Sequence, residues 1–199
     1  MAKKMILHTV LSELENILSG SAALIDLYKS KENTFFDKTV VWIERLEKFA
    51  ADNKWAFNSS LAGLRGRLVT ASRTRREDRF DWMPRSNNNR RAREALAAET
   101  VKIAVELATA YVSTDRALHD EASNLLRQLL AEAALKGIVS LKPTNGNGNH
   151  VAKVWAAMAA NPEFGQACAH AVGLVGAYNV YILLDKCLNE ILINGNGAK

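Results

Sequence analysis

Apolar residues recur along most of this chain at intervals of three and four, which is the spacing of an amphipathic helix. Residues 4–18 are typical, because Leu7, Leu11, Leu14 and Leu18 all fall on one helical stripe. The alternation of apolar and polar residues that marks a half-buried strand is hard to find. The pattern therefore predicts an all-α fold, a helical bundle of about six to seven helices joined by short loops.

Capping residues and small residues divide the first half of the chain into three helices. The run of small residues at 19–21 predicts a kink in the first helix. Thr34 is expected to be the N-cap of a second helix that runs to about residue 49. Asn53 is expected to be the N-cap of a third helix that runs to about residue 68.

The second half predicts four more helices. Two are expected at 90–111 and from Ser113 or Thr114 to Gly137, separated by a break at the sequence YVSTD and packed as an antiparallel pair. A short helix is expected at 151–161. Asn161 is followed by proline and glutamate, which predicts the start of a last helix that reaches about residue 194.

Length and composition are those of one globular domain. The chain has 199 residues, 48% hydrophobic and 24% charged, which is enough to bury a sizeable core. We expect a single helical domain over residues 1–194, with an arginine-rich loop at 72–90 between the third and fourth helices. Asparagine and glycine are frequent in two other segments, so residues 142–149 are expected to be a flexible connector and residues 195–199 a disordered tail.

Positive charge is concentrated in one segment of the sequence. Residues 65–93 hold ten arginines against three acidic residues, a net charge of +7, whereas the whole chain has a net charge of +5. The segment contains no lysine, while the rest of the chain holds 13 lysines and three arginines. This separation indicates a requirement for guanidinium rather than for positive charge in general.

The arginines and two aromatic residues among them form the predicted site. Guanidinium groups make paired hydrogen bonds to phosphate, and aromatic rings stack on unpaired bases. We therefore predict a nucleic-acid-binding surface for RNA or single-stranded DNA, with RNA favoured over DNA. The predicted contact residues are Arg65, Arg67, Arg73, Arg75, Arg76, Arg79, Phe80, Trp82, Arg85, Arg90, Arg91 and Arg93.

Two other interpretations of the arginine segment stay open. In the first, it docks on an acidic protein surface, and the chain is an adaptor or structural assembly protein. In the second, the arginines pair with the three acids between them, and the two aromatic rings anchor the loop to the core.

A long apolar stretch lies near the C-terminus. Residues 167–184 are 18 residues without a charged side chain, close to the length of a membrane span. His170 and Asn179 inside the stretch favour a central core helix instead. Gly173 and Gly176 predict the close approach of another helix, within the bundle or between copies. We therefore expect a homo-oligomer or a subunit of a larger complex, and no membrane partner.

The remaining candidate chemistry is sparse. A straight helix would hold Cys168 and Cys187 roughly 28 Å apart, beyond disulfide distance, and the N-terminus does not have a signal-peptide pattern, so we expect a reducing cytoplasm. Asp115 and His119 are four residues apart but lack a nucleophile elbow. Metal-ligand spacings and phosphate-binding glycine loops are missing from the sequence. We expect a non-catalytic protein with no metal, no cofactor and no small-molecule substrate.

Overall fold

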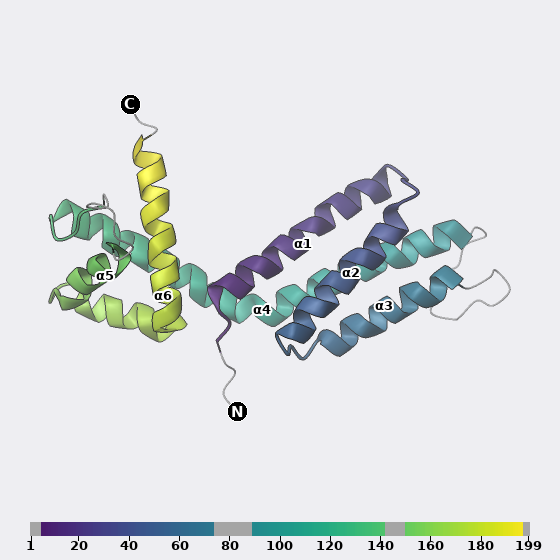
Figure 1. Ribbon diagram of the computed structural model, residues 1–199, viewed down its shortest axis with the longest axis horizontal. Helices are drawn as coiled ribbons and strands as arrows, with labels where there is room; N and C mark the ends of the chain where they lie inside the picture. Colours follow the sequence, from purple (N-terminus) through teal and green to yellow (C-terminus); the bar gives the residue numbers. More distant parts are fainter. Residues whose placement is uncertain (1–4, 74–88, 142–149, 197–199) are drawn as a thin grey trace. The chain divides into compact units, whose positions relative to one another are not determined.

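The computed structural model describes residues 5–73, 89–141 and 150–196, and these residues form six α-helices with no strand among them (Figure 1). The helices are α1 (His8–Lys29), α2 (Phe35–Asp52), α3 (Asn58–Arg73), α4 (Asn89–Leu135), α5 (His150–Ala160) and α6 (Gly165–Asn196). The predicted all-α bundle of about six to seven helices is confirmed, with six in the described residues.

The chain divides into two compact units. The four-helix unit comprises Val10–Val112, and the C-terminal unit comprises Met1–Thr9 together with Ser113–Lys199. The single domain expected over residues 1–194 stays a prediction.

In the four-helix unit, α1, α2, α3 and the part of α4 up to Val112 run antiparallel in succession (Figure 1). Ile43, Leu46 and Leu61 are fully buried in its core. The Trp42 indole Nε1 donates a hydrogen bond to the carbonyl of Ile17 at 2.8 Å, which joins α2 to α1. α1 is helical through residues 19–21, so the predicted kink is wrong. The Trp42 ring packs next to Gly20, 3.4 Å from where a Cβ would stand, which is an ordinary van der Waals distance.

The turns that follow α1 and α2 share one backbone arrangement, the Schellman motif. The Lys31 N–H donates to the carbonyl of Tyr28 at 3.2 Å, and the Lys54 N–H donates to that of Ala51 at 2.9 Å. In each turn the next residue's N–H donates to the carbonyl five residues back, at 3.0 and 2.9 Å. The two lysines have φ of 58° and 55°, the left-handed conformation that glycine adopts most easily.

Asn53 closes α2 instead of opening α3, so the prediction for this residue is wrong. Its side-chain Nδ2 donates to the carbonyl of Phe49 at 2.9 Å, and α3 begins at Asn58. Asparagine suits both ends of a helix, and here the C-terminal position is taken. Thr34 stands at the N-cap position of α2, as predicted, but its side chain makes no capping hydrogen bond.

α4 is one helix of 47 residues, so the predicted break at YVSTD and the antiparallel pair built on it are wrong. The sequence predicts a helix start at Ser113 or Thr114, with the Asp115 carboxylate favourable in its first turn. In the structure this carboxylate accepts a hydrogen bond from the backbone N–H of Ile6 at 3.3 Å. The Asp115 carboxylate thus binds a segment far away in the sequence, and α4 continues through residues 113–115.

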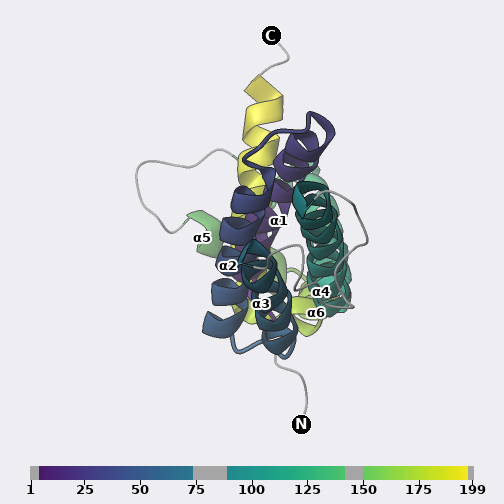
Figure 2. The same cartoon turned by 90° about the vertical axis from the view of Figure 1, so that its right-hand side faces the viewer.

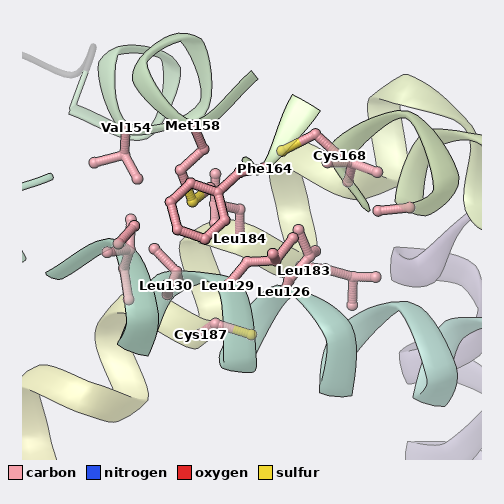
Figure 3. Packing of buried hydrophobic residues seen from close by; sticks show 14 of the residues in the cluster. Leu126, Leu129, Leu130, Val154, Met158, Phe164, Cys168, Leu183, Leu184 and Cys187 are labelled. Atoms are coloured by element: carbon pink, nitrogen blue, oxygen red, sulfur yellow. The ribbon is translucent and has the colours of Figure 1, made fainter. Parts of the chain in front are cut away.

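The C-terminal unit has a core contributed by three helices (Figure 3). Leu126 and Leu130 come from α4, Met158 from α5 and Leu184 from α6, and all four are fully buried. Phe164, in the turn between α5 and α6, lies among them. Removing these apolar side chains from water stabilises the C-terminal unit.

α6 changes direction at Gly176, so the predicted continuous helix is wrong. The φ and ψ of Gly176 are 79° and 155°, a backbone conformation that is strained for any residue with a Cβ. Gly173 does not mark a close contact either, since among the described residues nothing lies within 4 Å of where its Cβ would stand. The helix approach predicted within the bundle is therefore wrong for Gly173, while an approach between copies stays a prediction. Gly176 serves the change of direction.

Cys168 and Cys187 lie in the same buried cluster, although they stand on opposite sides of Gly176. The separation expected from a straight helix therefore does not apply. Both cysteines are free thiols with 1% of their surface exposed, and burial raises the pKa of both. They pack as small apolar side chains.

By length and hydropathy, Gly165–Ile191 is the one described helix segment that could cross a membrane. Its buried side chains include Ala171 and Val175 before Gly176, and Val180 and Leu183 after it. The helix is also interrupted at that glycine. Only 39% of its most apolar stretch is buried, and Tyr178 is 63% exposed, so the helix is covered on one face and the expected central core helix, covered on all sides, is wrong. The expected lack of a membrane partner stays a prediction.

Candidate nucleic-acid interface

Three parts of the chain meet at one end of the four-helix unit: the α1–α2 turn, the end of α3 and the start of α4 (Figures 1 and 2). The antiparallel succession of the helices requires this, because every second connection falls at the same end. The exposed cations here are Lys29, Lys31, Arg73, Arg90 and Arg91, which together define the basic end. Residues from two distant sequence regions thus share one surface.

Arg90 connects two of these parts directly. Its Nη2 donates a hydrogen bond to the carbonyl of Lys31 at 2.9 Å, across 59 positions of sequence. Its Nε donates to Glu94 one turn further along α4, at 2.7 Å. Arg90 therefore fixes the α1–α2 turn against the first turn of α4.

The helix termini at the basic end differ in how they suit positive charge. α3 ends with Arg73, which is favourable at the negative end of the helix dipole. α4 begins with Asn-Arg-Arg-Ala, so its first turn adds arginines to the positive end of the dipole. That arrangement is unfavourable for an isolated helix and becomes favourable when an anion is present.

The remaining described arginines of the predicted site have different surroundings. Arg67 is exposed on α3, and Arg93 is half-buried on α4. Arg65 pairs with Glu47 of α2 through both Nε and Nη2. The hydrogen bond to Glu47 raises the pKa of the Arg65 guanidinium. Arg65 therefore contributes to the packing of α3 on α2.

Half of the predicted contact residues lie outside the described part of the chain. These are Arg75, Arg76, Arg79, Phe80, Trp82 and Arg85. The two aromatic residues expected to stack on bases are among them, so the structure places the ends of the arginine segment and not its middle.

A groove runs between α1 and α4 in the same unit, with a volume of about 320 Å³. Buried Phe35 and Val101 lie among its lining residues, and Ile25 and Tyr28 of α1 are the exposed apolar ones. Lys102 is its one lining cation. The full lining is Ser21, Ile25, Tyr28, Phe35, Ala98, Val101, Lys102, Val105 and Glu106.

Sequence reasoning did not predict that the α1–α2 turn and the groove belong to the candidate site. Lys29 and Lys31 are isolated lysines in the sequence, so charge counting gives them no weight. The usable signal was topological, because in a four-helix bundle the first and third connections lie at the same end. An arginine-rich third connection therefore implies that the first connection belongs to the same surface.

The buried polar residues of the C-terminal unit serve to hold a backbone segment. Asp115 accepts from the N–H of Ile6, and His119 Nε2 lies 2.9 Å from the carbonyl oxygen of the same residue. Asn179 Oδ1 accepts from the N–H of His8 at 3.0 Å. Asp115 and His119 thus contact the backbone N–H and the carbonyl of Ile6, and these contacts hold this segment in place.

Metal chemistry has no candidate in the described part of the chain, where no group of three histidine, cysteine or acidic side chains could hold an ion. No family model, no curated protein and no solved structure matches this chain.

Proposed function

We propose that this protein is a non-catalytic nucleic-acid-binding subunit that contacts RNA or single-stranded DNA through the basic end of the four-helix unit. The observation that carries the proposal is the segregation of ten arginines into residues 65–93. Arg73, Arg90 and Arg91, together with Lys29 and Lys31, present exposed cations at the end where this segment leaves α3 and enters α4. Phosphate groups are the anions that such a cluster of guanidinium groups suits best.

RNA is favoured over DNA, and self-association or incorporation into a larger nucleoprotein complex in the cytoplasm completes the proposal. Neutralising phosphates releases counterions, so the logarithm of the association constant falls linearly with the logarithm of salt concentration. With about four to six phosphate contacts on a single strand, the slope is about −3 to −4, at ~0.7 per contact.

The test compares two triple variants by fluorescence anisotropy with a labelled 20-nucleotide RNA over a salt series. Replacing Arg73, Arg75 and Arg76 with alanine should flatten the slope by about two units, from three lost contacts. The control replaces Arg45, Lys48 and Lys54, three exposed cations of α2 and the α2–α3 turn, and should leave the slope unchanged.

Equal effects of the two triple variants would mean that binding follows overall charge and has no site. If the parent protein binds no RNA or single-stranded DNA at low salt, the proposal is wrong. The arginine segment would then be an adaptor surface for an acidic protein, and binding to polyglutamate in place of RNA would support that assignment.

A further inference from the structure

Two large apolar side chains on α1 remain exposed beside the groove. Ile25 and Tyr28 have 45% and 44% of their surface exposed, although the adjacent Leu24 is buried. They stand three positions apart on α1, and Ser21 precedes them by one turn, so the three residues line one wall. The opposite wall comes from Ala98, Val101 and Val105 of α4, which follow the same helical spacing.

The floor and one edge of the groove are aromatic. The Tyr28 and Phe35 ring centroids lie 5.1 Å apart with 50° between the ring planes. Phe35 is buried, so its ring is fixed by the core, whereas the Tyr28 ring reaches the surface. A flat apolar group that enters the groove meets an aromatic surface there, as a nucleobase does in proteins that bind single strands.

The groove adjoins the basic end. The carbonyl of Tyr28 accepts the hydrogen bond from the Lys31 N–H at 3.2 Å, and the carbonyl of Lys31 accepts that from Arg90. On α4, Ala98 follows Arg90 by eight residues, roughly 12 Å along the helix. Lys102 at the rim pairs with Glu106 at 3.9 Å. Cations thus lie near the aromatic edge, where the phosphates beside an inserted base would run.

We propose that the α1–α4 groove binds one unpaired base of a single-stranded nucleic acid whose phosphates contact the basic end. This rests on the proposed function and makes it more specific. A base in a duplex is stacked and paired, so the groove selects single strands over duplexes. Lys102 and Glu106 in the groove lining pair with each other and leave the lining without net charge. Charge complementarity therefore comes from the adjoining basic end, which Tyr28 of the groove reaches through the hydrogen bond from the Lys31 N–H.

The experiment combines a ligand without bases with a variant that fills the groove. The two probes are a 20-nucleotide single strand and an oligonucleotide of the same length with an abasic backbone, which carry the same phosphate charge. For the parent protein, the base-bearing strand should bind about tenfold or more tightly, the effect of one stacked base. Ala98→Leu should lower that ratio by about tenfold, the effect of one stacked base, and leave the salt slope unchanged, because it occupies the groove without changing charge.

The matched control is Ala23→Leu, an exposed alanine of α1 that does not line the groove. It should keep the parent's ratio. If Ala98→Leu keeps it too, the groove binds no base, although the basic end still binds phosphate. A parent that binds neither oligonucleotide overturns the proposed function itself, which is a different outcome.

A second measurement uses the parent protein, in case Ala98→Leu fails to fold. A strand containing 4-thiouridine is cross-linked by light, and the modified peptides are identified by mass spectrometry. Cross-links to Tyr28 or its neighbours on α1 and α4 are expected. Cross-links found only elsewhere overturn the assignment. A molecular mass of Ala98→Leu that is half the parent's, measured by light scattering without nucleic acid, also overturns it, because the groove would then be a contact between copies.

Discussion

The two ends of the four-helix unit are built on the same turn and differ in what surrounds it. Lys31 and Lys54 occupy equivalent left-handed positions in the turns after α1 and α2. At the Lys54 end, Trp55 packs against three aromatic rings, with centroid distances of 5.2 Å to Phe49, 5.6 Å to Phe57 and 5.4 Å to Tyr111. At the Lys31 end, the aromatic pair lies beside an open groove and a set of exposed arginines.

This difference leaves aromatic surface buried at one end of the bundle and partly exposed at the other. Trp55 and Phe57 are buried, so their apolar surface is already used to hold the fold. Tyr28 is half-exposed, so part of its ring surface is still available to a ligand.

The largest effect is expected from the aromatic residues. Trp55→Ala should lower the free energy of unfolding by about 3–5 kcal/mol, because it removes a buried ring at the centre of the cluster. Tyr28→Ala should lower it by about 1 kcal/mol, since less of the ring is buried. Urea denaturation measures both. Equal losses would mean that the aromatic residues at the basic end are as structural as those at the other end.

Arg90 should matter to stability and to binding, whereas its neighbour should matter only to binding. Arg90→Ala removes the hydrogen bond to the Lys31 carbonyl and the pair with Glu94. The free energy of unfolding should fall by about 1 kcal/mol. This is less than a buried charged hydrogen bond contributes, because the Arg90 side chain is half-exposed. Arg91→Ala removes an exposed side chain and should change stability by less than about 0.5 kcal/mol.

Each of these variants should flatten the salt slope for RNA by about 0.7 if its arginine contacts one phosphate. Thermal melting together with anisotropy separates the two effects. A loss of stability in Arg91→Ala as large as in Arg90→Ala would remove the positioning role of Arg90.

The smallest effect comes from the two left-handed lysines. Lys31→Gly and Lys54→Gly should each raise the free energy of unfolding by about 0.5–1 kcal/mol, because glycine adopts a positive φ without strain. Lys31→Gly alone should also flatten the salt slope, by about 0.7. Neither variant is expected to unfold, so the comparison tests charge at one end without damage to the fold. A flatter slope for Lys54→Gly would place phosphates at the wrong end.

The fold could be predicted from the sequence where helical periodicity was sufficient, as in α2 and α5. It could not be predicted at residues 113–115, because an acid in the first turn of a helix and one that accepts a hydrogen bond from the Ile6 N–H look alike in sequence. Gly176 was recognised as unusual, but only its φ and ψ distinguish a change of direction from a helix contact. In the candidate site, the arginines follow from composition, whereas Tyr28 and Lys31 depend on which helix ends lie together.

The hold of Asp115, His119 and Asn179 on residues 6–8 has a consequence for the order in which the chain is made on the ribosome. The four-helix unit is complete in sequence once Val112 has emerged, and domains fold as units during synthesis. Residues 6–8 are made before the four-helix unit, yet Asn179 is made more than 60 residues after Val112. At roughly 5–20 residues per second, several seconds pass between the synthesis of Val112 and that of Asn179, the last residue to bond to this segment.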